Sequence, residues 1–223
     1  MGKNVLFIAP HPDDEILGCG GIIKKFSDQG DTVIVLIMTR GKKELYSEER
    51  ILNVRKEALS AHQILGVKQT IFFEFPAPDL DTIPMSELSS SVSEILRDYG
   101  INSLYLPHGG DIHQDHKAVF RAGLIAARPA GPVLVKEIFS YETLSETEWS
   151  DPGYGNPFIP NVFVNIGYEL AYKKEAMSCY KSQLREFPSS RSLKSIEALA
   201  NLRGSTVGVE YAEAFMAIRI IKD

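Results

Sequence analysis

The chain has 223 residues, 44% of them hydrophobic and 24% charged, and a formal net charge of −5, as in an ordinary globular protein. The acidic balance argues against a nucleic-acid or anionic-membrane partner, and no apolar run approaches the roughly 20 residues that span a bilayer. Two distant cysteines, Cys19 and Cys179, and an N-terminus without a signal-peptide pattern predict a cytoplasmic location.

Strands and helices are predicted to alternate along the first 140 residues. Apolar runs predict strands at residues 5–10, 32–39, 70–75 and 103–107, and helices at residues 16–30, 47–66, 85–100 and 116–128. The strands are continuous apolar runs, a pattern typical of strands buried on both faces. We therefore expect an α/β fold, with a Rossmann-like, mostly parallel sheet flanked by helices on both faces.

The pattern loosens after Pro129. It predicts strands at 137–143 and 162–167, helices at 168–184 and 193–204, and a final apolar-periodic segment at 210–221. A Gly/Pro/Asn-rich loop between the two strands carries Trp149, Tyr154 and Phe158. With no disordered linker and no internal repeat, we expect a single domain over residues 1–223, with a core at about 3–140 and a C-terminal elaboration at about 141–223.

Two clusters of histidines and carboxylates follow predicted strands. The first comprises His11, Asp13, Asp14 and Glu15, and the second Asp111, His113, Asp115 and His116. The carboxyl ends of strands in an open α/β sheet face one crevice, so the clusters can meet there. A hydrolytic zinc site needs three protein ligands and one open position, and His11, Asp14 and His116 could supply the three. The same donor set also suits Fe²⁺.

The neighbours of these candidate ligands suggest a hydrolase. Asp13 could accept a proton from water whose pKa a bound ion lowers toward 7. His113, in its protonated form, could stabilise an oxyanion and protonate a departing amine. Asp115 or Asp111 could hold the second ring nitrogen of His113. Together these roles describe amide hydrolysis.

Other interpretations of the same residues exist. The acids after His11 could simply cap the following helix. The glycines at 18–21 suggest a nucleotide site, but their spacing does not complete GxGxxG, and the preceding acids would repel a pyrophosphate. We expect these glycines to let the helix pack closely on the sheet, and Cys19, His62 and His108 to be structural.

The run APHPDDE at residues 9–15, followed by GCGG and by HQDH at 113–116, resembles the LmbE-like (PIG-L) zinc-dependent deacetylases. That family removes acetyl groups from N-acetylglucosamine units on lipids, thiol precursors or other small carriers. The similarity extends to residues 55–58, 65–67 and 203–215, and so covers most of the chain. The loop around residues 145–160 resembles the family least.

The resemblance implies a role for each motif residue. His11, Asp14 and His116 would be zinc ligands, and Asp13 the general base. His113 would stabilise the oxyanion and donate a proton, with Asp115 as its partner. The choice of His116 over His113 as ligand depends mainly on the resemblance.

Residues that contact substrate are harder to predict. Arg40 and Arg55 could reach the crevice and bind a phosphate or sugar hydroxyls. Arg203 lies in a segment similar to the family, and Trp149, with Tyr154 and Phe158, could stack on a sugar ring or form a lid. For each of these residues, an ordinary surface or packing role is the alternative.

We therefore predict a zinc-dependent hydrolase that removes the N-acetyl group from an N-acetylated amino sugar or its conjugate. The predicted partner is this small molecule, without nucleic acid or stable membrane insertion; a homo-oligomer is compatible with the sequence. One alternative is a zinc amidase that cleaves a larger acyl group from a sugar–thiol conjugate. Another is a non-catalytic binding module. A two-metal phosphoesterase would need more bridging carboxylates.

Overall fold

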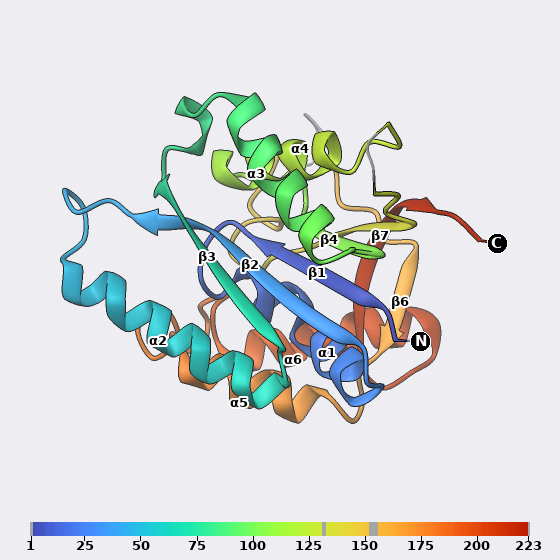
Figure 1. Ribbon diagram of the computed structural model, residues 1–223. Coiled ribbons are helices and arrows are strands. Elements are labelled where there is room, and N and C mark those ends of the chain that lie inside the picture. The colour runs from blue at the N-terminus through green and yellow to red at the C-terminus, as the bar shows by residue number, and fades with distance from the viewer. Residues whose placement is uncertain (1, 131–132, 152–155, 223) are drawn as a thin grey trace.

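A computed structural model describes residues 2–130, 133–151 and 156–222 (Figure 1). Its strands are β1 (Asn4–Ala9), β2 (Thr32–Gly41), β3 (Gln69–Ala77), β4 (Ser103–Pro107), β5 (Glu137–Tyr141), β6 (Val162–Asn165) and β7 (Ala212–Ile220). They form a single sheet in the order β3-β2-β1-β4-β5-β7-β6. Strands β1 to β5 are parallel, whereas β7 is antiparallel to both of its neighbours. The predicted mostly parallel α/β sheet is confirmed.

Helices cover both faces of the sheet. They are α1 (Asp14–Asp28), α2 (Glu48–Leu65), α3 (Met85–Asp98), α4 (Gln114–Ala126), α5 (Leu170–Cys179) and α6 (Leu193–Val207), with a short 3-10 helix, η1 (Leu80–Thr82). Helices α3 and α4 lie on one face and α1, α2, α5 and α6 on the other (Figure 1). Among the described residues, no helix has both the length and the apolar character needed to cross a bilayer.

The hydrophobic core has one layer on each side of the sheet. Alternate residues of a strand point to opposite faces, so Val5 and Phe7 of β1 enter one layer, and Leu6 and Ile8 enter the other. All four side chains are fully buried. The continuous apolar runs of the sequence therefore correspond to strands that are covered on both faces.

The order of the strands places a crevice between β1 and β4. The chain moves outward from β1 through β2 to β3, then returns to pair β4 with the other edge of β1. The segments that leave the carboxyl ends of β1 and β4 therefore diverge at a topological switch point, where ligands bind in open α/β sheets. The two histidine and carboxylate clusters follow these two strands.

Helix α1 packs tightly on the sheet at Gly18. A Cβ at this position would lie 2.3 Å from the ring of Tyr141 and 2.9 Å from the backbone oxygen of Glu142. Cys19, the next residue, is fully buried in the core. The expectation that the glycines serve close packing is confirmed.

One C-terminal element differs from the sequence prediction, and a second, to which the sequence assigned no type, is a strand. The helix predicted over residues 168–184 ends at Cys179, because Tyr180 leaves the helical conformation and its hydroxyl donates to Glu15 Oε1 at 2.5 Å. The apolar-periodic segment 210–221 contains strand β7, which continues the sheet beyond β5.

Candidate metal centre and active site

His11, Asp14 and His116 meet at the switch point. His11 follows β1, Asp14 is the first residue of α1, and His116 lies in the first turn of α4. Asp14 Oδ2 lies 3.2 Å from His11 Nδ1 and 3.3 Å from His116 Nε2. One ligand atom from each side chain lies within 4.8 Å of the other two, so these residues could hold a metal ion.

A carboxylate holds the outer ring nitrogen of each of these histidines. His11 Nε2 is 2.9 Å from Asp115 Oδ2, and His116 Nδ1 is 2.8 Å from Asp111 Oδ2. The second oxygen of Asp115 accepts a hydrogen bond from the amide of Leu80. Metal-ligating histidines usually have such carboxylate partners, which fix the ring orientation and leave the other nitrogen free to bind the ion.

Two buried atoms of this group fit a divalent cation. Asp14 Oδ1 and His116 Nε2 are buried and have no hydrogen-bond partner, although buried polar atoms are nearly always paired. A set of two imidazole nitrogens and a carboxylate suits zinc or Fe²⁺. The residues present therefore fit such an ion.

The electrostatics of the group support the same interpretation. Burial opposes protonation of both histidines, but Asp115 and Asp14 raise the pKa of His11 to about 9, while Asp14 and Asp111 raise the pKa of His116 to about 10. Burial opposes ionisation of Asp14, yet His116 and His11 hold its pKa well below the usual value. The site thus favours two positive charges, which a divalent cation bound to neutral imidazoles would also supply.

A second group of side chains that could hold a metal consists of His11, His113 and Asp115. Both groups share His11, so they describe neighbouring parts of one pocket. In this second group, the carboxylate of Asp115 already bonds to His11 and to the amide of Leu80. It contains neither of the two unpartnered atoms.

Asp13 lies beside the candidate ligands in an unusual backbone conformation. Its φ of 109° is in the left-handed region, which non-glycine residues seldom adopt. The amide of Asp13 donates to Glu15 Oε2 at 3.1 Å, and its carboxylate accepts from Arg191 Nη1 at 2.7 Å. Burial raises the pKa of Asp13 to about 8 against the opposing charge of Arg191. A carboxyl group of this kind can take up and return a proton near neutral pH.

His113 differs from the sequence expectation in its partner. Its Nδ1 accepts a hydrogen bond from the backbone amide of Asp115 at 3.1 Å, whereas the carboxylate of Asp115 contacts His11 instead. Burial and the neighbouring His11 lower the pKa of His113. The geometry therefore favours a neutral ring that carries its proton on Nε2, rather than the charged ring held by a carboxylate that the sequence suggested.

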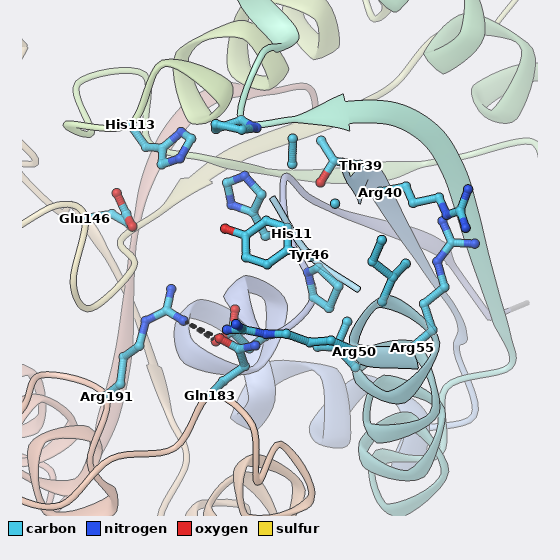
Figure 2. Close-up of a pocket in the computed structure, with 17 residues that line it drawn as sticks. His11, Thr39, Arg40, Tyr46, Arg50, Arg55, His113, Glu146, Gln183 and Arg191 are labelled. Atoms are coloured by element: carbon cyan, nitrogen blue, oxygen red, sulfur yellow. Dashed lines mark hydrogen bonds and ion pairs between the residues drawn. The ribbon is translucent and has the colours of Figure 1, made fainter. Parts of the chain in front are cut away.

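A cavity of about 280 Å³ opens beside this centre (Figure 2). His11, Asp13 and His113 line it, as do Arg40 at the end of β2 and Arg55 on α2. In Figure 2, Arg40 and Arg55 lie on the opposite side from His113, Glu146 and Arg191. The structure therefore brings the two predicted arginines to the same cavity as the motif residues.

Arg203 and Trp149, in contrast, do not line this cavity. Arg203 makes a two-point ion pair with Glu142, at 2.8 and 2.5 Å, and faces a separate cavity of about 420 Å³ together with Phe158. Trp149 is 59% exposed. Both residues lie outside the cavity beside the candidate metal centre, so their contacts with substrate stay a prediction. Tyr154 lies outside the described residues.

Several residues of the cavity carry no recognisable sequence signal. Glu146, Gln183 and Arg191 lie far from both motifs in the chain, yet line the same cavity. Glu146 is buried, which raises its pKa to about 7 with a further contribution from Asp14. Neither a motif nor a strand end marks these three residues, so the sequence alone could not have identified them.

The remaining histidines have structural partners, as expected. His62 Nε2 contacts Glu15 Oε1 at 3.1 Å and its Nδ1 contacts Thr70 Oγ1 at 2.8 Å. His108 Nε2 donates to the backbone oxygen of Asn156 at 2.6 Å. Neither histidine lines the cavity beside the candidate metal centre.

Comparison with known proteins gives consistent results. The family model described as PIG-L, GlcNAc-PI de-N-acetylase, matches residues 6–127. The chain is 30% identical over 186 residues to the uncharacterized deacetylase YaiS of Escherichia coli, covering 81% of this chain and 91% of that protein. It is 29% identical to the diacetylchitobiose deacetylase of Thermococcus kodakarensis, covering 95% and 81%. The crystal structure of the conserved protein TT1542 from Thermus thermophilus superposes with a TM-score of 0.80 and 27% identity, covering 98% and 96%.

Proposed function

The chain belongs to the PIG-L family of GlcNAc-PI de-N-acetylases, and from that membership we propose that it is a zinc-dependent enzyme that hydrolyses the acetamide of an N-acetylated amino sugar or its conjugate. Membership makes it a hydrolase of the N-deacetylase type. The observation that carries the proposal is the pair of buried atoms without a hydrogen bond, Asp14 Oδ1 and His116 Nε2, beside a cavity that Asp13 also lines.

In the proposed reaction, each residue has a chemical task. A bound ion would be held by His11, Asp14 and His116, and would polarise the acetamide carbonyl and acidify water. Asp13 removes a proton from the attacking water, and the N–H of His113 donates a hydrogen bond to the oxygen that becomes negative. Asp13 then returns the proton to the departing nitrogen, so that the products are acetate and a free amine.

Arg191 supports the role of Asp13. Its guanidinium contacts Asp13 Oδ2 and also donates to Ser145 Oγ at 2.8 Å and Gln183 Oε1 at 3.2 Å. This network holds the carboxylate of Asp13 in place at the cavity, which His113 also lines. Arg191 therefore orients the proposed base.

The proposal can be tested by measuring metal content and acetate release together. We expect the purified protein to contain about one equivalent of zinc or iron, and His116→Ala to lose it. Reloaded wild type should release acetate from N-acetylglucosamine conjugates, and a series of longer acyl groups should react progressively more slowly. His108→Gln serves as a histidine control, because His108 contacts Ser140 and Asn156 and lies outside the cavity. A wild type that binds no metal after reloading and releases no acetate would contradict the proposal.

A further inference from the structure

The carboxylate that holds His116 is itself held from a distant segment. Asp111 contacts His116 Nδ1 through Oδ2, and its other oxygen, Oδ1, accepts a hydrogen bond from the hydroxyl of Thr147 at 2.6 Å. Both Asp111 and His116 are fully buried. Thr147 lies 36 residues beyond Asp111, in the segment after β5, and belongs to neither histidine cluster.

We infer that Thr147 is a positioning residue for the candidate metal centre. Its hydroxyl fixes the carboxylate of Asp111, which in turn fixes the ring of His116 and leaves Nε2 as the ligand atom. Thr147 does not line the cavity beside the metal centre, so it acts through these two residues and not by contact with substrate. The inference rests on the metal site of the proposed function. It adds a residue outside both motifs on which the affinity for the metal depends.

The direction of each hydrogen bond in this chain follows from the atoms involved. The backbone amide of Thr143 donates to Thr147 Oγ1 at 2.8 Å, so the single hydroxyl hydrogen of Thr147 is available for Asp111. An ionised carboxylate only accepts hydrogen bonds, so His116 Nδ1 carries the ring hydrogen that bonds to Asp111. In the neutral ring that binds a metal, Nε2 then keeps its lone pair. Nε2 is one of the two buried atoms without a hydrogen bond.

Two further hydrogen bonds join the same two segments. The amide of Ile112 donates to the backbone oxygen of Glu146 at 3.3 Å, and Ser150 Oγ donates to the backbone oxygen of Gly110 at 2.7 Å. Three consecutive residues, 110–112, therefore bond to the segment after β5. The flanking bonds hold only the backbone of the loop, whereas the middle one holds the carboxylate of Asp111.

The other histidine of the centre has its carboxylate held differently. Asp115, the partner of His11, accepts from the backbone amide of Leu80 at 2.9 Å. A side-chain substitution does not remove that amide, but one at Thr147 removes the equivalent bond to Asp111. Loss of an outer partner of a metal-ligating histidine lowers metal affinity by about 10–100-fold. Because Thr147 is one step further out, we expect an effect at the lower end of this range.

The test compares the zinc affinity of the metal-free protein and its variants, by competition with a coloured chelator. Thr147→Val keeps nearly the same side-chain shape without the hydroxyl, and should raise the dissociation constant for zinc about tenfold. Thr147→Ser keeps the hydroxyl and should retain the wild-type affinity. Ser150→Ala is the matched control, because it removes a hydroxyl bond to the same loop without touching the carboxylate of Asp111. It should also bind zinc as the wild type does.

A double-mutant cycle tests the route through Asp111. Asp111→Ala should itself weaken zinc binding, and adding Thr147→Val to it should cause no further loss, because the partner of the hydroxyl is already gone. The Tm of each metal-free variant is measured alongside. A purely structural role of Thr147 would lower this Tm and leave the zinc dissociation constant unchanged. If Thr147→Val does not fold, Thr147→Ala takes its place.

The outcomes separate this inference from the proposed function. Equal zinc affinity in wild type and Thr147→Val, or an equal loss of affinity in Ser150→Ala, would overturn the inference even if the protein releases acetate. The expected loss in Thr147→Val, in a protein that releases no acetate from any amino-sugar conjugate, would support the positioning role and contradict the proposed function.

Discussion

Asp13 shows how one residue can combine backbone strain with chemistry. A left-handed conformation costs a non-glycine residue about 1–3 kcal/mol, so the surrounding structure must enforce it. Glu15 does so by accepting the amide hydrogen of Asp13. The other oxygen of Glu15 contacts both His62 and Tyr180 inside the protein. The last residue of the HPDDE motif is thus a buried support for the proposed base.

Replacing Asp13 with Asn tests its role directly. The substitution keeps the size of the side chain but removes the oxygen that would take up a proton. We expect kcat to fall by about 10²–10⁴-fold, because that is the usual contribution of a general base, while the metal content stays at the wild-type value. Asp98→Asn, an exposed change on α3, should alter neither quantity. Turnover at the wild-type rate in the Asp13 variant would show that another group accepts the proton.

Helix α1 depends on close approach to the sheet. Because a Cβ on Gly18 would overlap both the Tyr141 ring and a backbone oxygen, Gly18→Ala must displace α1 or β5. We expect a loss of about 1–3 kcal/mol in the free energy of unfolding, the usual effect of overpacking a core. Denaturant titration measures it. Gly167→Ala is a suitable comparison, since its new methyl group would meet only the side chain of Asn165, at 3.3 Å. A stability loss of the same size in both variants would argue against the packing explanation.

The first five strands could be predicted because their signal is local. An apolar run such as 103–107 is bounded by polar residues and is too short for a helix, so it favours a strand buried on both faces. The two histidine clusters were recognisable for the same reason, since each follows such a strand. Their meeting at one point could be inferred from the rule for parallel sheets, before any contact was known.

Other features depend on contacts between distant residues, which a local pattern does not show. The end of α5 is determined by the hydrogen bond from Tyr180 to Glu15, 165 residues away in the chain. Arg191 reaches Asp13 across 178 residues. Arg203 is the opposite case. Its segment resembles the family, yet its guanidinium pairs with Glu142 and does not line the cavity. Residue type and spacing alone do not distinguish these two arginines.

At the scale of the whole molecule, the candidate metal centre connects segments that are distant in the chain. His11 and His116 come from segments more than a hundred residues apart, and an ion between them would connect β1, α1 and α4. A ligand that binds the folded state but not the unfolded state stabilises the folded state by mass action.

Removal of the metal should therefore lower the thermal stability. At a free zinc concentration about 100 times the dissociation constant, the ion contributes about 2.7 kcal/mol. For a chain of this size, this corresponds to about 5–10 °C in Tm. Calorimetry with and without a chelator measures the difference, and reloading should restore it. His116→Ala should show no such response, so a chelator effect of equal size in this variant would locate the metal elsewhere.

The arrangement of the cavity has an evolutionary consequence. All three candidate ligands lie within residues 6–127, the segment that matches the family model, whereas Glu146, Gln183 and Arg191 lie beyond it. Exchanging residues 128–223 with those of a relative would thus replace one wall of the cavity and leave the candidate ligands in place. Inheritance of the N-terminal part alone would keep these ligands but not Arg191, which orients the proposed base, so the reaction depends on both parts of the chain.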